Sequence, residues 1–351
     1  MGTVRASYPT YVNIKACPDN APSEGRRRLE LELMHRWRTT TYTSLCCLPE
    51  DGPFLQVELP RWALTHGYLM HGILAMSLLE AGLQGDSARS DEDQSRYVRM
   101  AMEYYDDSSA AFRAQLRSVR PDNIHILYTY SCMAVVINMA LFRCRYHDNT
   151  PHSRGMLRHV AGLLELFIGC SWLANEYTDW LLESPIRPLV IRANEQSMPA
   201  VSKPLEGPVD VALTRLMCAV NNSTLAVNEA DEVPASTRLH SHQSAVTHLR
   251  ACFAVSMNSE VAGFCGEFPS LAGKDFTQDV KDSDPVALLI LLHWAVLLQS
   301  VDTWTWWAGS FGINLVHEIS DVLEQTHPQL AVKQQWQEGI AWARNEVGIA
   351  F

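Results

Sequence analysis

Apolar residues gather in long runs separated by polar breaks, and three of these runs have no wide polar face. Residues 68–79 are almost wholly apolar, and so are residues 124–141 (IHILYTYSCMAVVINMAL) and 286–298 (VALLILLHWAVLL). A helix that is apolar on every side is typical of the interior of a large helical domain. The first run is too short to cross a bilayer. We therefore expect core helices and no membrane span.

Amphipathic stretches lie between these runs, and strand-like alternation is scarce. The spacing of apolar residues predicts further helices from Ser23 onward and over residues 96–118, 156–168, 209–227, 237–256, 313–323 and 330–347. Gly169 is expected to end one helix, and the Gly- and Asp-rich residues 258–285 are expected to form a loop. The pattern predicts an all-α fold of about nine to eleven helices in a single domain, 24–351, after an irregular segment, 1–23.

Charge and cysteine content limit the partners and the compartment. The chain has 351 residues and a formal net charge of −11, which argues against a general nucleic-acid surface. The only basic cluster, Arg26-Arg27-Arg28, is interpreted as an exposed helix start. The nine cysteines include no Cys-x-x-Cys pair, and residues 1–23 contain no apolar leader. These features predict a reducing, intracellular location, cytoplasmic or nuclear, and no direct nucleic-acid binding.

Most cofactor and metal chemistry has no matching motif. His66 and His71 are five residues apart, so they point about 140° apart on a helix and would not share one ion. The Asp-Asp-x-x-Asp pattern of metal-dependent terpene cyclases fails, since Ala110 stands where the third acid of the Asp106-Asp107 motif should be. No phosphate-binding glycine motif is present. We predict no cofactor and no metal.

Several motifs resemble one family, the C-terminal effector domains of fungal zinc-cluster transcription factors, with the sterol-uptake-control branch closest. They are the lead-in LELELMHRWRTTTYTSL (29–45), the Pro60, Arg61, Ala63, His66, Leu69, His71, Gly72, Leu74 and Ala75 set, the segment 104–116 with Pro121-Asp122-Asn123, and the tract DTWTWWAGSFGINLVHEI (302–319). The resemblance implies an all-α domain that encloses a hydrophobic pocket for a sterol or another lipid, that is regulated by its ligand, and that can form a homodimer.

One departure from the family affects this interpretation. The family's DNA-binding cluster places six cysteines within about thirty residues around two zinc ions. This chain has only Cys17 before residue 46. It is therefore either an effector region without its DNA-binding part or a stand-alone relative with another task.

Large apolar and aromatic side chains are the candidates for the pocket that the resemblance implies. Three tryptophans within residues 304–307, close to two glycines, suit a rigid wall around a flat, apolar ligand, although such residues also commonly fill a core. The predicted ligand-binding residues are Trp37, Met70, Leu74, Tyr130, Met133, Trp294, Trp304, Trp307 and Phe311.

Two functions follow as alternatives. The first is a ligand-binding regulatory domain whose partner is a hydrophobic small molecule. The second is a cofactor-independent enzyme of fungal secondary metabolism, a cyclase, isomerase or cycloaddition catalyst that reuses the same pocket. In that case His71, His293 and Asp302 are the candidate acids and bases. A histidine held by hydrogen bonds within the core is the other interpretation of His71 and His293.

Overall fold

The protein is helical throughout the part of the chain that the structure describes. The computed structural model describes residues 24–46, 48–84, 91–146, 155–197, 205, 207–223, 235–256, 267–301 and 305–349. Over these residues it contains fifteen α-helices, joined by short 3₁₀ and π turns, and no strand. The predicted all-α fold is confirmed. The predicted irregular segment, 1–23, lies outside the described residues.

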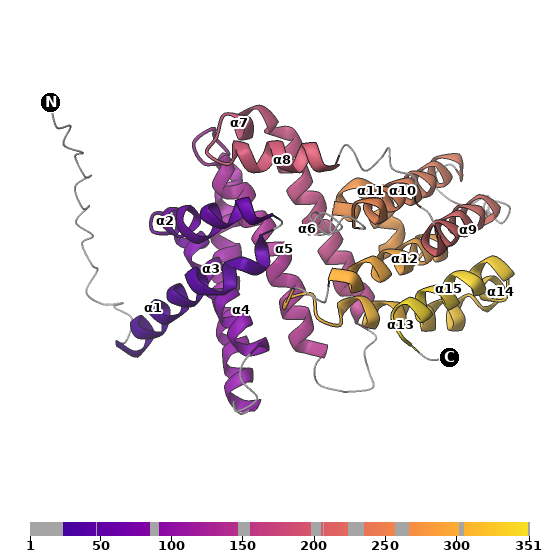
Figure 1. Cartoon of the computed structure of the whole chain (residues 1–351), viewed down its shortest axis with the longest axis horizontal. Helices are drawn as coiled ribbons and strands as arrows, with labels where there is room; N and C mark the ends of the chain where they lie inside the picture. The colour runs from indigo at the N-terminus through magenta and orange to yellow at the C-terminus, as the bar shows by residue number, and fades with distance from the viewer. Residues whose placement is uncertain are drawn as a thin grey trace.

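Helix α3 (Gly67–Leu83) is the centre of the N-terminal half, and thirteen of its seventeen residues are buried. The short helix α2 (Leu59–Ala63) precedes it. Helix α3 packs against α1 (Glu24–Thr39), α4 (Asp91–Gln115) and α5 (Ile124–Tyr146) (Figure 1). We call the buried cluster around α3 the N-terminal core; it includes Trp37, Ile73, Leu74, Tyr104, Tyr130 and Ile137.

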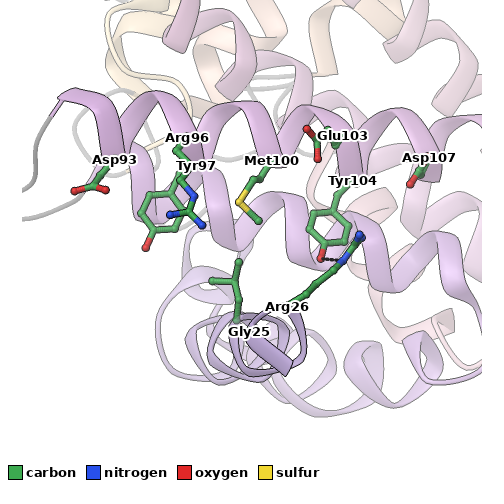
Figure 2. Close-up of a pocket in the computed structure, with 10 residues that line it drawn as sticks. Gly25, Arg26, Asp93, Arg96, Tyr97, Met100, Glu103, Tyr104 and Asp107 are labelled. Atoms are coloured by element: carbon green, nitrogen blue, oxygen red, sulfur yellow. Dashed lines mark hydrogen bonds between the residues drawn. The ribbon is translucent and has the colours of Figure 1, made fainter. Parts of the chain in front are cut away.

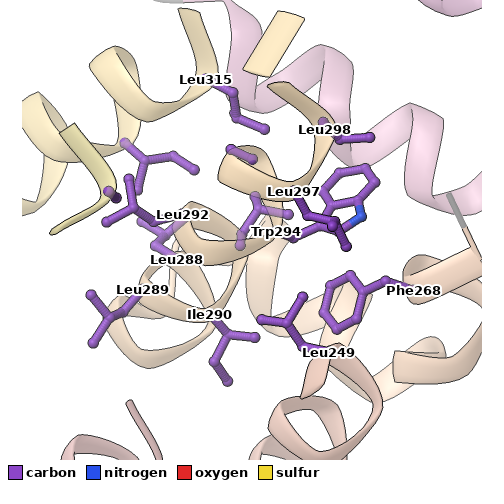
Figure 3. Close-up of a cluster of buried hydrophobic side chains, with 14 of the residues drawn as sticks. Leu249, Phe268, Leu288, Leu289, Ile290, Leu292, Trp294, Leu297, Leu298 and Leu315 are labelled. Atoms are coloured by element: carbon purple, nitrogen blue, oxygen red, sulfur yellow. The ribbon is translucent and has the colours of Figure 1, made fainter. Parts of the chain in front are cut away.

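Helix α12 (Pro285–Val301) has the same central place in the C-terminal half. The carboxylate of Asp284 caps its first turn, accepting hydrogen bonds from the backbone N–H groups of Val286 and Ala287, both at 2.9 Å. Its apolar side chains form the middle of a second cluster, the C-terminal core (Figure 3). The helices around it are α6 (Met156–Glu176), α9 (Pro208–Ser223), α10 (Ala235–Ser256), α11 (Phe268–Lys281), α13 (Phe311–Thr326) and α15 (Gln334–Glu346).

Helix α5 contributes to both cores. Tyr130 and Ile137 belong to the N-terminal core, whereas Met139 and Phe142 belong to the C-terminal core. Its near-continuous apolar sequence follows from this position, because a helix between two cores has little surface left for polar residues. A third, smaller cluster lies under α7 (Thr178–Leu182) and α8 (Arg187–Ser197); its buried members are Ile124, Leu173, Leu181 and Ile186.

Helices differ from the sequence predictions in three places. The helix count exceeds nine to eleven partly because α2, α7 and α14 (Pro328–Ala331) are only four or five residues long, too short for an apolar period. Helix α6 continues through Gly169, since Leu173 still packs against the third cluster and this outweighs the helix cost of glycine. Helix α11 lies where a loop was expected, because Gly273, at φ 86°, kinks it and masks its period.

Two helices have the length and hydropathy of a membrane span among the described residues. They are Ile124–Cys144, whose apolar window is 72% buried in the fold, and Met156–Glu176, whose window is 39% buried. Length and composition are weak evidence, because a core helix of a soluble protein passes the same test. No clear membrane span is therefore shown in the described part of the chain.

Candidate functional site

The predicted ligand-binding residues divide between the two cores. Trp37, Leu74, Tyr130 and Met133 are buried in the N-terminal core, with Met70 half-buried at its edge. Trp294 and Phe311 are buried in the C-terminal core. Trp304 lies outside the described residues. The structure therefore groups five of these residues around α3 and two around α12.

Trp307 is half-buried and packs against both cores. Its indole N–H donates a hydrogen bond to the backbone carbonyl of Ser44 at 3.0 Å, and that of Trp306 donates to the Ser44 hydroxyl at 2.7 Å. Ser44 lies in the short 3₁₀ helix Thr41–Leu45, which follows α1. The hydrogen bonds of these two tryptophans thus connect the 3₁₀ helix after α1 to the C-terminal half of the chain.

The two predicted catalytic histidines also lie in different cores. His293 is fully buried beside α15, where its ring stacks on Trp342 at a centroid distance of 5.1 Å. Its Nδ1–H donates to the Leu289 carbonyl at 2.8 Å, and its Nε2 has no hydrogen-bond partner among the described groups. Burial lowers the pKa of His293 to about 4, so the ring is neutral at pH 7. Asp302 lies outside the described residues.

A cavity of about 550 Å³ opens where α1 crosses α4 (Figure 2). The first turns of α1 supply one wall, and the α4 side chains at successive turns supply the other. Its volume falls in the range of small-molecule sites. The lining residues are Gly25, Arg26, Leu29, Asp93, Arg96, Tyr97, Met100, Glu103, Tyr104 and Asp107.

A hydrogen-bonded group of three side chains joins the two walls of this cavity. The Tyr104 hydroxyl donates to the Glu30 carboxylate at 2.7 Å. Arg26 Nε donates to that carboxylate at 3.2 Å and to the Tyr104 oxygen at 3.3 Å, while its guanidinium carbon lies 5.1 Å from the Tyr104 ring centroid. Burial, and then the hydrogen bond to Glu30, raise the pKa of Tyr104 to about 12. The phenol therefore keeps its proton and acts as a donor.

His71 lies behind this group. Its ring meets the Tyr104 ring edge-on, with centroids 5.3 Å apart. Burial lowers the pKa of His71, and the nearby Asp107 opposes this shift. His71 is thus a neutral side chain of α3 that supports the cavity wall.

The cavity wall is mixed in character. Arg26 and Arg96 bring positive charge, Asp93, Glu103 and Asp107 bring negative charge, and Leu29 and Met100 bring apolar surface. Such a wall suits a molecule with polar groups on an apolar body. No group of three or more His, Cys, Asp or Glu side chains is placed to hold a metal ion in the described part of the chain.

Sequence reasoning missed most residues of this cavity. Arg26 and Glu30 are four apart, which is the spacing of a helical ion pair, and this signal was present in the sequence. Asp107 was weighed only as part of a failed metal motif. The crossing of α1 over α4 depends on tertiary packing, and no local pattern encodes it.

Comparison with models of protein families, with curated proteins and with solved structures gives no match for this chain.

Proposed function

We propose that this protein is a ligand-binding regulatory domain of the kind that its resemblance to fungal effector domains implies. The observation that carries the proposal is the cavity between α1 and α4, which lies over the helix that bears the family motif. The proposal includes a nuclear or cytoplasmic location. It also includes a homodimer, and a partner protein or another segment that supplies the DNA binding this chain lacks.

The ligand that fits this wall is amphipathic. Leu29 and Met100 offer apolar contact, and the guanidinium of Arg96 offers hydrogen-bond donors. Carboxylates at Glu103 and Asp107 would accept from a ligand hydroxyl. A sterol or another lipid with one or more hydroxyl groups combines these features in a body of suitable size.

Regulation would follow from the place of the cavity between two helices. A ligand that contacts both α1 and α4 favours the arrangement in which α1 is docked. The free energy of that preference is set by how much more tightly the ligand binds the docked state. Helix α1 is thus the element through which binding would be transmitted.

The enzymatic alternative has less support. A general acid or base must reach the reacting atoms, and the pKa of Tyr104, near 12, holds its proton at neutral pH. His293 is sealed in the C-terminal core, away from α1 and α4. Binding without chemistry is the simpler use of the same side chains.

The experiment combines native mass spectrometry with cavity variants. Protein purified from a fungal host is analysed for a bound molecule, which is extracted and identified, and binding of a hydroxysterol is then measured by its effect on thermal stability. Met100→Trp should fill the cavity and lose the ligand, whereas Arg99→Trp, at an exposed position of the same helix, should keep it. Arg96→Ala and Arg99→Ala form a second matched pair for the polar contacts. Equal binding by Met100→Trp and the wild type would contradict this cavity as the site.

A further inference from the structure

Helix α6 carries apolar surface that the described residues leave uncovered. Only 39% of its apolar window is buried in the fold, against 72% for α5. The side chain of Trp172 is 49% exposed, and Ile168, one helical turn before it, is half-buried without belonging to any of the three apolar clusters. Large apolar side chains that lie together on a surface mark a place where another molecule binds.

Six exposed residues of α6 lie along one line of the helix. Their spacing alternates between four and three residues, which is the seven-residue repeat of a helix that packs lengthwise against a second helix. We call this row the α6 stripe, and its members are Arg158, Gly162, Glu165, Gly169, Trp172 and Glu176.

The α6 stripe is complementary to itself when two copies of the helix lie antiparallel. A two-fold axis at the level of Phe167 brings residues that are equally far from position 167 to the same height. Trp172 of one copy then faces Gly162 of the other. By the same symmetry, Arg158 of one copy faces Glu176 of the other. A large side chain therefore meets a gap, and a cation meets an anion.

The gap at Gly162 has room for the indole. A Cβ atom added at Gly162 or Gly169 would meet no atom within 4 Å. Bare backbone at these two positions lets a second helix approach closely. The Trp172 ring already packs edge-on against Tyr177, with centroids 5.9 Å apart, so part of its conformational freedom is lost before binding.

The charges at the two ends of the stripe fit the same arrangement. Arg158 lies in the first turn of α6 and Glu176 is its last residue, so each charge is at the unfavourable end of the helix dipole. Neither side chain has an ion-pair partner in the described part of the chain. Antiparallel pairing supplies a partner to both, at both ends of the interface. Glu165, near the middle, already pairs with Lys281 of α11 in its own chain.

We propose that α6 is the dimer interface of this protein, with two copies packed antiparallel across the α6 stripe. The inference goes beyond the ligand-binding cavity, and it specifies the homodimer that the proposed function includes. Helix α6 has 21 residues and is therefore about 31 Å long. It packs against α5, α7, α11 and α13, whereas α1 and α4 line the cavity, so dimerisation and ligand binding can be measured separately.

The test is the mass of the full chain in solution, measured by sedimentation equilibrium over a concentration series. We expect the wild type to reach twice the mass of one chain. Trp172→Ala should raise the dissociation constant of the dimer by about tenfold or more, because a buried tryptophan is a typical interface anchor.

A charge exchange tests the antiparallel register. Arg158→Glu and Glu176→Arg should each weaken the dimer by about tenfold, because like charges then face each other. The double variant, which carries both substitutions, should regain the wild-type affinity. Arg99→Glu makes the same charge change at an exposed position of α4 and should leave the dimer unchanged. Thermal unfolding of each variant confirms that it is folded.

The outcomes separate this interface from the ligand-binding proposal. A dimer that none of the single substitutions at Arg158, Trp172 and Glu176 weakens, or a double variant as weak as the single ones, would overturn the α6 interface but leave the homodimer. A wild type that stays monomeric at its highest soluble concentration would overturn both. A monomer that binds vesicles of phosphatidylcholine and phosphatidylserine through Trp172 would also overturn the dimer and assign the surface to lipid. Met100→Trp tests the cavity independently of all these results.

Discussion

In the N-terminal core several buried polar side chains pair with one another, whereas the buried side chains of α12, at the centre of the C-terminal core, are aliphatic or aromatic apart from His293. In the first, the carboxylate of Glu80 accepts hydrogen bonds from Thr41 at 2.6 Å and Arg36 at 2.8 Å, and Ser108 bonds to the Tyr130 hydroxyl at 2.6 Å. In the second, His293 is the one buried titratable side chain among the described residues of α12, and one of its nitrogens has no partner.

This difference separates two ways of specifying a fold. A buried ion pair contributes little net stability but is costly to break, so it fixes one arrangement of the helices that carry it. A hydrocarbon core is specified by shape and volume. The cavity lies beside the N-terminal core, where hydrogen bonds and ion pairs hold α1 in place.

The largest expected effect comes from breaking the polar pair of the N-terminal core. Arg36→Met keeps the aliphatic stem but leaves the Glu80 carboxylate, which is 5% exposed, without its cation. We expect a loss of about 3–4 kcal/mol in the free energy of unfolding, measured by urea denaturation. Arg38→Met, at an exposed position of the same helix, should change stability by less than about 0.5 kcal/mol. Equal effects of the two substitutions would mean that the Glu80 pair does not hold α1.

The next effect is a pH dependence that belongs to the C-terminal core. The pKa of His293 is lowered to about 4 in the folded state, from an ordinary value of 6.5, so the unfolded chain binds the proton more tightly. Its stabilising contribution is complete above pH 6.5 and is lost as pH falls from 6.5 towards 4. The maximum loss is about 3 kcal/mol.

Denaturation curves of the wild type and of His293→Leu, recorded between pH 7 and pH 4, check this expectation. The variant should lose the part of the slope that His293 supplies. His240→Leu, at an exposed position, should keep the wild-type slope. If the slope of His293→Leu matches the wild type, acid sensitivity arises elsewhere.

The smallest expected effect concerns shape. A Cβ atom at Gly312 would lie 2.5 Å from the carbonyl oxygen of Ala295 and 2.6 Å from the backbone nitrogen of Gln299, both on α12. Gly312→Ala should therefore push α13 away from α12 and cost about 1–3 kcal/mol. Gly162→Ala, where nothing lies within 4 Å, should stabilise α6 slightly. Thermal unfolding of the two variants gives the comparison, and a neutral Gly312→Ala would show that this contact is loose.

The sequence predicts the long helices well because their apolar runs are strong and local. The runs that predict α3, α5 and α12 appear as buried helices in the structure. Pair interactions were harder to foresee. Glu80 lies inside an apolar run, and its partners Arg36 and Thr41 are about forty residues away. On α4, Tyr104 is buried at 3% exposure because α1 covers that side of the helix, and the sequence of α4 alone does not reveal this contact.

The candidate site was predicted only in part. His71 was singled out and stands behind the cavity wall, but Arg26 and Arg96 read as ordinary surface arginines of amphipathic helices. Trp307 was predicted to bind a ligand, and the hydrogen bonds of its indole N–H and that of Trp306 to Ser44 had not been foreseen. Contacts between distant segments decide these roles, and a helical period carries no information about them.

The sharing of α5 between the two cores limits how this chain can be divided. A fragment that ends before residue 124 would leave the N-terminal core without Tyr130 and Ile137, and one that begins after residue 146 would leave the other core without Met139 and Phe142. Each half would then expose apolar surface that only this helix covers. Expression of either half alone should therefore give aggregated material, whereas the whole chain should stay in solution.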